Sequence, residues 1–514
     1  MAARYTPSWS SGGGRGQKGG GAWGRSVGVE SGVFNRAACA ALACEPEVLP
    51  CATYSYVAKS PGTIDVVCPA WSVRRLRALP GPPCSIDLSL ERGLAALQGE
   101  DGGFEVTPEL CALLGLEEIG SALALAEEAD ARALGALLAL KAVDHYKGAQ
   151  LSSALAAVRH RAEGLVCSCL GLEPDELRAE LDAVGAAAGA AAKGALPAAA
   201  AAALDANFAP HGRWSFFELW PRLLPEETLE ALRLEGGVLC PRFFLVDLAC
   251  APWSPYDVDK SYPLVRCGPR LFVGQPASDD GGGRDAMRQG RQLEAALLTF
   301  GWLEEDHVLT EVRLPGARVV FSAAPDGLEG EGEAVALEPL AAFDDEAYEA
   351  EGYSLAEVFP AAASGHVDRS CRLWRAPLPP APPEAFVEVK KTTHLNGRPG
   401  EFKLLKFWLQ AALMRCGAVV VATTDGSQDG DTVREVRRLP LKELAARVES
   451  RSVWGALSGM LRHVLAGTAE ADGAWTLRVR KERDLRSAVR LELSRGWRGE
   501  EDPRSILERV ARCF

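Results

Sequence analysis

The chain of 514 residues has too few basic residues to coat nucleic acid with its whole surface. It carries 56 Lys and Arg against 69 Asp and Glu, which gives a formal net charge of −13 at pH 7. Any contact with a polyanion therefore has to come from a local basic patch. An acidic chain stays compatible with a carboxylate-based enzyme centre, because bound metal ions offset the charge of the carboxylates.

Zinc-type cysteine pairs and long apolar runs are also missing. The 14 cysteines form no CxxC cluster, and Cys167 and Cys169 are too close together for a usual zinc pair. We therefore expect reduced thiols in a nuclear or cytoplasmic protein. No apolar run reaches about 18 residues without charges or breakers, so no membrane span is expected. Histidines are few and scattered, and none is assigned a role.

Four zones follow one another along the chain. Residues 1–34 are rich in Gly, Ser and Arg, which predicts a disordered tail, with a transit peptide as the alternative. Residues 35–109 are expected to supply the N-terminal part of the fold, and residues 110–235 an Ala-rich helical insertion. Residues 236–514 are predicted to form the catalytic core, a mixed α/β domain, because strand-like and helix-like patterns alternate there.

The core is expected to be a central mixed sheet flanked by helices. Its patterns predict strands at 268–274, 317–323, 385–391 and 418–423, and helices at 286–300 and 401–414. The strand at 418–423 is apolar nearly throughout and is therefore expected at the centre of the sheet. The acidic, Pro-rich segment 327–384 is predicted to be a long insertion between two core strands.

The strand at 385–391 carries the most informative side chains. Because side chains alternate along a strand, Phe386, Glu388 and Lys390 share one face. The strand at 317–323 is followed by Asp326, which adds a carboxylate where the chain leaves the sheet. Pro-Asp, a long spacer and Glu-x-Lys together match the pattern of the PD-(D/E)xK nuclease core.

These residue types suit metal-assisted hydrolysis of phosphate esters. Mg²⁺ and similar hard cations take carboxylate oxygens together with phosphate oxygens of the substrate. A bound ion activates water, and a lysine such as Lys390 orients that water or balances the charge of the transition state. The alternative is a surface ion pair between Glu388 and Lys390.

Two neighbouring helices add polar groups to this pattern. Lys403, Lys406 and Gln410 form one stripe of the helix at 401–414, which predicts an amide near the metal centre and lysines near phosphates. Glu294 stands in an apolar stretch of the helix at 286–300, where a carboxylate needs a partner or a metal ion. The alternative is that Glu294 reaches solvent or pairs with an arginine.

At these residues the chain resembles the DXO family of RNA 5′-end decapping exonucleases, which have a PD-(D/E)xK-like core. Gly290–Glu294 is similar to the family's Gly-x-x-hydrophobic-Glu motif, and Phe386–Thr392 to its Glu-x-Lys motif. Phe321–Asp326 lies where the family has a strand that ends in Glu-x-Asp. Phe402–Gln410 gives the longest and most specific match, and the segment 72–89 resembles the family's N-terminal stretch.

The resemblance implies roles for these residues. Glu294, Asp326 and Glu388 would be ligands of Mg²⁺ or Mn²⁺, and Lys390 and Gln410 would position the water and the scissile phosphate. Lysines near them would bind the substrate, namely Lys391, Lys403 and Lys406. The implied substrates are RNAs with incomplete, triphosphate or NAD-type 5′ ends, and the implied partner is a 5′–3′ exonuclease.

Two departures from the family pattern keep other functions open. Ala324 stands where the family has its first strand-end glutamate, and Glu329 and Glu331 lie too far along the chain to replace it. Residues 241–248 are the stretch comparable to the family's Trp-Arg-Gly motif. They offer no arginine at the position that matches the arginine of the motif, and this absence predicts weaker phosphate binding. The alternatives are a catalytically weak relative that binds RNA ends or a partner exonuclease, and a DNA-directed nuclease with the same core.

Overall fold

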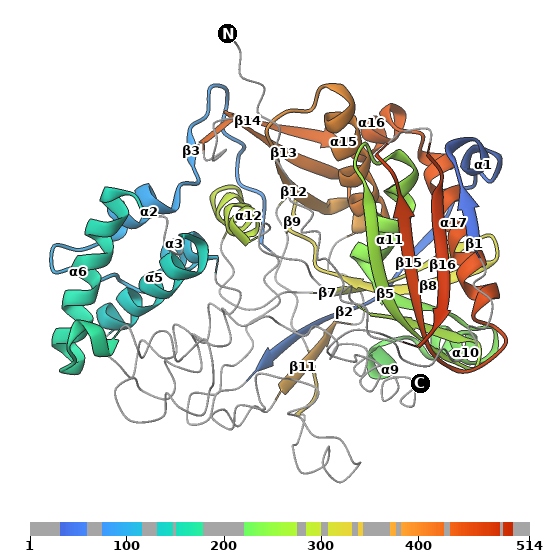
Figure 1. The fold of residues 1–514 in the computed structure, drawn as a ribbon, viewed down its shortest axis with the longest axis horizontal. Coiled ribbons are helices and arrows are strands. Elements are labelled where there is room, and N and C mark those ends of the chain that lie inside the picture. Colours follow the sequence, from blue (N-terminus) through green and yellow to red (C-terminus); the bar gives the residue numbers. More distant parts are fainter. Residues whose placement is uncertain are drawn as a thin grey trace, which may run out of the picture.

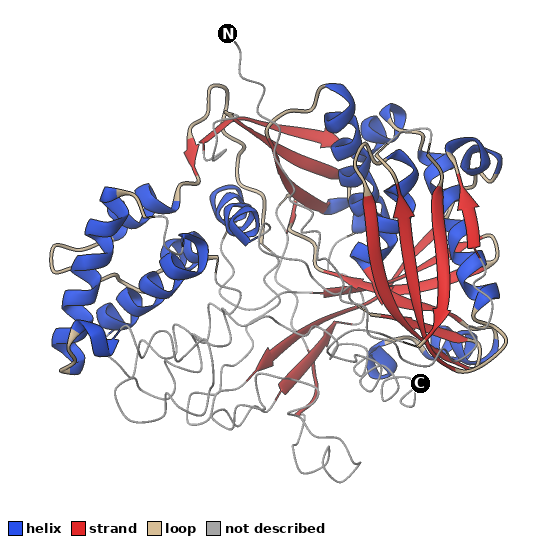
Figure 2. Ribbon diagram, in the orientation of Figure 1, coloured by secondary structure: helices blue, strands red, loops and turns tan. Residues whose placement is uncertain are grey.

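The computed structural model describes twelve segments of the chain. They are residues 31–58, 74–115, 131–147, 151–177, 220–274, 284–299, 307–330, 338–342, 371–376, 382–425, 432–483 and 487–496. Within them, two sheets and their helices form a mixed α/β core, and a group of helices lies apart from the strands (Figures 1 and 2). The predicted fold class is therefore confirmed.

The larger sheet has eleven strands among the described residues. In spatial order they are β1 (Ser31–Phe34), β16 (Val489–Arg495), β15 (Gly473–Lys481), β5 (Val258–Cys267), β6 (Arg270–Val273), β4 (Gly237–Pro241), β8 (Ala317–Ala323), β7 (His307–Leu314), β2 (Glu47–Ala58), β11 (Cys371–Ala376) and β10 (Glu338–Ala342). Strands β4 and β8 are parallel, with Pro241 level with Ser322. Chain segments that follow these two strands therefore leave the sheet at the same edge.

The smaller sheet has five strands, in the order β3 (Ile86–Asp87), β14 (Thr432–Pro440), β13 (Ala418–Thr424), β12 (Phe386–Thr392) and β9 (Gly327–Leu328). Strands β12 and β13 are parallel, and α15 (Gly397–Leu413) connects them. Strand β13 lies at the centre of the sheet, as its apolar sequence predicts. Strand β9 directly follows the end of β8, so the chain crosses from one sheet to the other within a few residues.

Opposite faces of β12 contact different helices. Phe386 belongs to the main core, together with side chains of the larger sheet, of α11 (Arg242–Cys250), of α15 and of α17 (Ser450–Gly467). Val387 and Val389 point the other way and pack against Leu293 and Leu297 of α12 (Arg284–Leu297). Two short helices, α1 (Arg36–Ala41) and α16 (Leu441–Arg447), complete this part. Single 3₁₀ turns follow α11 and precede β12, at Ala251–Trp253 and Pro383–Ala385.

A separate apolar core holds four helices together. They are α2 (Leu90–Leu97), α3 (Pro108–Leu114), α5 (Ala131–Lys147) and α6 (Ser153–Leu170). Ser89, Thr107 and Ser152 accept hydrogen bonds from backbone amides at the starts of α2, α3 and α6, which is the usual N-cap arrangement. This helical unit includes α2 and so begins before residue 110, the predicted start of the helical insertion.

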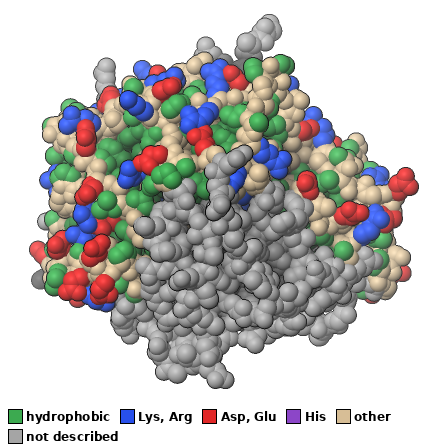
Figure 3. Space-filling view, turned by 180° about the vertical axis from the view of Figure 1, so that it is seen from behind, with side chains coloured by type: hydrophobic (Ala, Val, Ile, Leu, Met, Phe, Trp, Pro, Cys, Tyr) green, Lys and Arg blue, Asp and Glu red, His purple; other side chains and the backbone are tan. Residues whose placement is uncertain are grey.

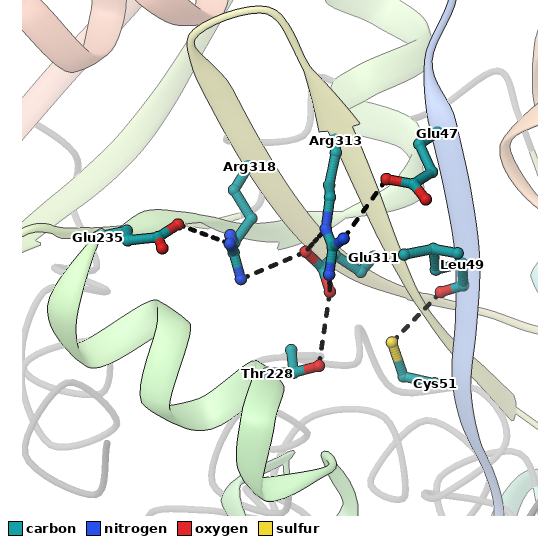
Figure 4. Close-up of polar contacts among 8 residues, drawn as sticks. All are labelled: Glu47, Leu49, Cys51, Thr228, Glu235, Glu311, Arg313 and Arg318. Carbon is teal, nitrogen blue, oxygen red and sulfur yellow. Dashed lines mark hydrogen bonds and ion pairs between the residues drawn. The ribbon is translucent and has the colours of Figure 1, made fainter.

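Two helices that were predicted to belong to the insertion pack elsewhere. They are α9 (Trp220–Leu223) and α10 (Glu226–Leu234). Thr228 of α10 donates a 3.5 Å hydrogen bond to the buried Glu311 of β7, and Glu235 pairs with Arg318 of β8 at 2.6 Å (Figure 4). The helical end of the predicted insertion is thus fixed to the larger sheet.

The predicted elements of the core form close to their expected places. The strand at 317–323 has the predicted bounds, whereas α12 and α15 begin two and four residues early. The tail predicted for 1–34 is too long, because Ser31–Phe34 pair with β16; residues 1–30 lie outside the described residues. Most of the predicted insertion at 327–384 is also outside them.

The described residues also bear on membrane-spanning helices, cysteine thiols and surface charge, three features that the composition concerns. None of the described helices combines the length and the apolar composition that crossing a bilayer requires. The cysteines whose side chains the structure describes are free thiols. On the face of the molecule seen in Figure 3, basic and acidic side chains are mixed, without a surface of one sign.

Gly417 offers a test of how tightly α15 and β12 are fitted. Its amide donates to the carbonyl oxygen of Phe386 at 2.9 Å, and a Cβ there would collide with the carbonyl oxygen of Glu384. We expect Gly417→Ala to lower the free energy of unfolding by about 1–3 kcal/mol, measured by urea denaturation. Gly290→Ala on α12 is the control, since a Cβ there meets nothing within 4 Å. It should raise stability by up to about 1 kcal/mol, and an equal loss in both variants would contradict the tight fit.

Candidate active site

The candidate site lies where the two sheets meet. Asp326 follows the end of β8, and Arg242 follows the end of the parallel neighbour β4, so both residues leave the larger sheet at one edge. Glu388 and Lys390 lie on the face of β12 that points to α11 and α15. Four side chains from two sheets thus converge on one small volume.

Asp326 joins the two sheets through a single oxygen. Its Oδ2 accepts a hydrogen bond from the amide of Val389 at 2.6 Å and another from Nζ of Lys390 at 3.0 Å. The amide bond fixes the carboxylate against the backbone of β12. The bond from Lys390 brings the charge of the lysine to it, and charge-assisted bonds of this kind are the strong ones.

Glu388 is fully buried and lies between two cations. Its Oε1 accepts a hydrogen bond from Nη1 of Arg242, and its Oε2 lies 2.5 Å from Nζ of Lys390. Burial raises the pKa of Glu388, but the charges of Arg242 and Lys390 outweigh burial and lower the pKa to about 2. Burial lowers the pKa of Lys390, but the negative charges of Asp326 and Glu388 outweigh burial. The pKa of Lys390 is therefore raised above its ordinary value. Glu388 and Lys390 are therefore both charged at neutral pH, and their pair is buried.

Arg242 corrects an expectation from the sequence. No arginine was expected at the matching place in the stretch 241–248, yet Arg242 bonds to Glu388 from the first turn of α11. Its Nη1 also lies 3.0 Å from Sδ of Met414, at the end of α15. The signal that was missed is its position directly after β4, parallel to the strand that precedes Asp326.

Glu294 completes the cluster from the opposite face of β12. Its Oε2 accepts a 2.9 Å bond from Nη1 of Arg74, so the alternative of an arginine partner holds. Burial raises the pKa of Glu294, and the negative charge of Asp326 adds to this against Arg74, Arg291 and Lys390. Glu294 therefore lies within electrostatic range of both Asp326 and Lys390.

The N-terminal segment at 74–77 explains how Arg74 reaches this place. Leu76 and Leu328 are linked by a 2.8 Å backbone hydrogen bond, and the amide of Leu328 donates to the carbonyl oxygen of Arg74 at 2.8 Å. The segment thus runs beside β9, next to the end of α12. Part of the sequence stretch 72–89, which resembles the family's N-terminal stretch, lies at the candidate site.

The polar stripe of α15, formed by Lys403, Lys406 and Gln410, contacts β12 at its first residue. Lys403 donates to Oγ1 of Thr392 at 3.0 Å, and burial lowers the pKa of Lys403. At the other end of the stripe, Met414 contacts Arg242. Gln410 is one turn before Met414 and so shares the face of α15 that reaches Arg242. The structure gives Gln410 no hydrogen bond to a described residue, which leaves its amide available for a ligand.

Two of the predicted substrate-binding lysines contact side chains other than the site carboxylates. Lys391 faces the opposite side of β12, where its Nζ donates to Oε1 of Gln289 on α12. Lys406 belongs to the same stripe of α15 as Lys403, and its Nζ lies 6.0 Å from the centre of the Phe402 ring. The described contacts of Lys391 and Lys406 are thus with Gln289 and Phe402, and the ion pairs described for Asp326 and Glu388 are with other residues.

The carboxylates fit a divalent cation in chemistry and only partly in position. No described residue donates a hydrogen bond to Oδ1 of Asp326, Oε1 of Glu294 or Oε2 of Glu388. Among the described residues, however, no three Asp, Glu, His or Cys side chains are close enough to hold one ion together. Asp326 and Glu388, which share Lys390, remain as a pair, and two carboxylates with phosphate oxygens suffice for Mg²⁺.

The position of the missing glutamate stays without a carboxylate. Ala324 is half-buried just beyond the end of β8. Glu329 does not replace the absent side chain, because its carboxylate pairs with Arg438, with Oε2 2.6 Å from Nη2. Glu331 lies outside the described residues.

Comparison with known proteins gives a likeness of fold. No family model and no curated protein matches the chain. Rai1 of S. pombe in complex with 3′-FADP is 13% identical over 53% of this chain and 77% of its own, with a TM-score of 0.36. Dxo1 of K. lactis in complex with manganese is 11% identical over 54% and 71%, with a TM-score of 0.33. Rai1 of Scheffersomyces stipitis with (3′-NADP)⁺ and calcium is 12% identical over 96% and 100%, with a TM-score of 0.43.

These structures are of the DXO family, the family that the sequence motifs resemble, and the chain is similar to them in fold at low identity. At such identities and TM-scores, the likeness carries no argument about the reaction. The site residues have to be argued from their own geometry.

The buried pairing of Glu388 predicts a dependence of stability on pH. Its pKa is lowered from 4.5 to about 2 in the folded state, so its contribution is present above about pH 4.5 and is lost as the pH falls toward 2. We expect Glu388→Gln to lower the free energy of unfolding by about 3–5 kcal/mol at pH 7, because it leaves buried cations without their partner. The difference from the unchanged protein should shrink as unfolding is measured at lower pH. A difference that is constant between pH 7 and 3 would contradict the assigned pairing.

Proposed function

We propose that this protein is a metal-dependent hydrolase that acts on the 5′ ends of RNA, with Asp326 and Glu388 as ligands of Mg²⁺ or Mn²⁺. The observation that carries the proposal is the position of Lys390, whose Nζ lies 3.0 Å from Asp326 and 2.5 Å from Glu388. Two carboxylates and a lysine in such contact are what metal-assisted phosphate chemistry needs. The RNA substrate class rests on the sequence motifs, of which Phe402–Gln410 is the longest match.

The pKa shifts of Lys390 and Glu294 suggest different roles for these two residues in the proposed reaction. Lys390 stays charged because two carboxylates hold it, so it serves as a fixed positive charge beside the phosphate and not as a base. Glu294 has a raised pKa and is therefore the carboxylate better suited to accept a proton from water. Arg242 and Gln410 offer donors to phosphate oxygens at the end of α15.

The bound ion would supply Lewis-acid activation of water and neutralise charge on the phosphate. In hydrolysis, the water oxygen forms a bond to phosphorus, and the P–O bond to the leaving nucleotide or pyrophosphate group breaks. One proton of the water passes to Glu294, and the leaving oxygen is protonated from solvent. Lys403, close to Thr392 at the end of β12, lies on the same stripe as Gln410 and is placed to bind a further phosphate. Together these side chains bind, orient and neutralise an anionic chain end.

Ala324 favours a second candidate function. Without the strand-end carboxylate, and with Glu388 already paired to Arg242 and Lys390, the chain would bind RNA ends or a partner 5′–3′ exonuclease and do little chemistry. A DNA-directed nuclease shares the same core chemistry. The substrates in one assay separate these three functions.

The assay uses purified protein with Mg²⁺ or Mn²⁺ and RNAs that end in triphosphate, NAD or monophosphate, with 5′-phosphorylated DNA alongside. We expect release of a 5′ group from RNA, and a loss of at least about 100-fold in Asp326→Asn. Glu329→Gln is the control, because Glu329 pairs with Arg438 instead of Lys390. Release from DNA alone, or RNA binding without release, would favour one of the other two functions.

The missing ligand can be restored. Ala324→Glu should raise the rate of 5′-end release about tenfold or more if the absent carboxylate limits metal binding, as losses at metal sites are of this order. Ala324→Gln provides a side chain of equal size without the charge and should give no gain. Equal rates in both variants and the unchanged protein would show that this position does not limit activity.

A further inference from the structure

The charges of the site are already balanced without a metal ion. Glu294 pairs with Arg74, Asp326 with Lys390, and Glu388 with both Lys390 and Arg242. Three carboxylates thus form ion pairs with three cations of the described residues, and Arg291 adds a further positive charge within electrostatic range of Glu294. A divalent cation is attracted to a cluster of net negative charge, so its entry requires that one of the resident cations withdraw.

Arg242 is the resident cation most easily withdrawn from Glu388. Lys390 forms ion pairs with two carboxylates, whereas Arg242 forms one, with Glu388, and Asp326 attracts it only from a longer range. The other hydrogen-bond partner of Arg242 is the thioether of Met414, which is a weak acceptor. Arg242 also begins α11, a helix of nine residues, and a positive charge is unfavourable at that end of a helix dipole. Its side chain is 18% exposed and so has a way toward solvent.

Glu388 gains from a replacement cation. It is completely buried, its Oε1 accepts from Arg242, and its Oε2 is paired with Lys390 at 2.5 Å. A buried carboxylate must keep a positive partner, because an unpaired charge in the interior is strongly destabilising. Lys390 supplies one positive partner at Oε2, and Arg242 and a divalent cation can each supply the partner of Oε1.

We propose that Arg242 is the internal counter-ion of Glu388 in the metal-free protein and competes with the divalent cation for this carboxylate. The inference rests on the proposed metal-dependent function. When the cation binds Glu388, the guanidinium is released beside the same centre, where its forked donors suit a phosphate group. Metal binding therefore prepares an arginine for the substrate, and metal and phosphate each favour the binding of the other.

The competition is tested by metal binding, without any assay of hydrolysis. Binding of Mn²⁺ is measured on the full chain by the loss of its free-ion signal in electron paramagnetic resonance. We expect Arg242→Gln to bind Mn²⁺ about tenfold more tightly than the unchanged protein, within the usual range of couplings between sites. Arg242→Lys keeps the charge with a single compact donor group and should lie between the two. This second variant decides the matter if Arg242→Gln does not fold.

Arg318→Gln is the matched control. Arg318 is 16% exposed, pairs with Glu235 at 2.6 Å and lies 3.4 Å from the buried Glu311 (Figure 4). It stands at the start of β8, whereas Asp326 follows the end of that strand. Arg318→Gln should leave Mn²⁺ binding unchanged. Equal or weaker Mn²⁺ binding in the Arg242 variants, while the unchanged protein binds, would overturn the competition alone. Absence of Mn²⁺ binding from the unchanged protein and the Arg242 variants would overturn the metal dependence as well.

Discussion

The contact on which the site depends is the pair of hydrogen bonds that Oδ2 of Asp326 accepts from Val389 and Lys390. Asp326 comes from the larger sheet and its two donors from the smaller one, so this oxygen sets the distance between the sheets. Lys390, held there, aligns Glu388, and Glu388 in turn holds Arg242 at the start of α11. Four residues from three parts of the sequence are thus fixed through one carboxylate.

The local part of this arrangement could be predicted from the sequence. Alternation along a strand places Glu388 and Lys390 on one face, and the apolar run at 418–423 places its strand in the middle of a sheet. Helical spacing likewise puts Gln410 and Lys403 on one stripe of α15. These predictions need only the period of a strand or helix, which neighbouring residues determine.

The long-range part could not be predicted in this way. The strands before Asp326 and around Glu388 belong to two sheets instead of one, because the two-residue β9 moves the chain from one sheet to the other. Arg242 reaches Glu388 across 146 positions of sequence, which depends on β4 lying parallel to β8. Such pairings are decided by tertiary packing and leave no periodic mark in the chain.

The helical unit (α2, α3, α5 and α6) supports the site by binding a buried arginine of α12. Arg288 of α12 is 1% exposed; its Nη1 donates to the carbonyl oxygen of Leu88 at 3.0 Å, and its guanidinium lies 5.8 Å from the Tyr146 ring centre. These contacts tie α12, which carries Glu294, to α5 and to Leu88, two residues before α2. The helices that the family motifs do not cover thus support the helix that presents one of the site carboxylates.

The two edge strands of the smaller sheet, β3 and β9, have only two residues each. Beside β9 the chain itself adds the segment at 74–77, which takes up the backbone groups of Leu328. An open strand margin invites pairing with a strand of another molecule, and short or covered margins are how natural sheets prevent it. The sheet that carries Glu388 and Lys390 is therefore closed to intermolecular strand addition along the side where its chemistry lies.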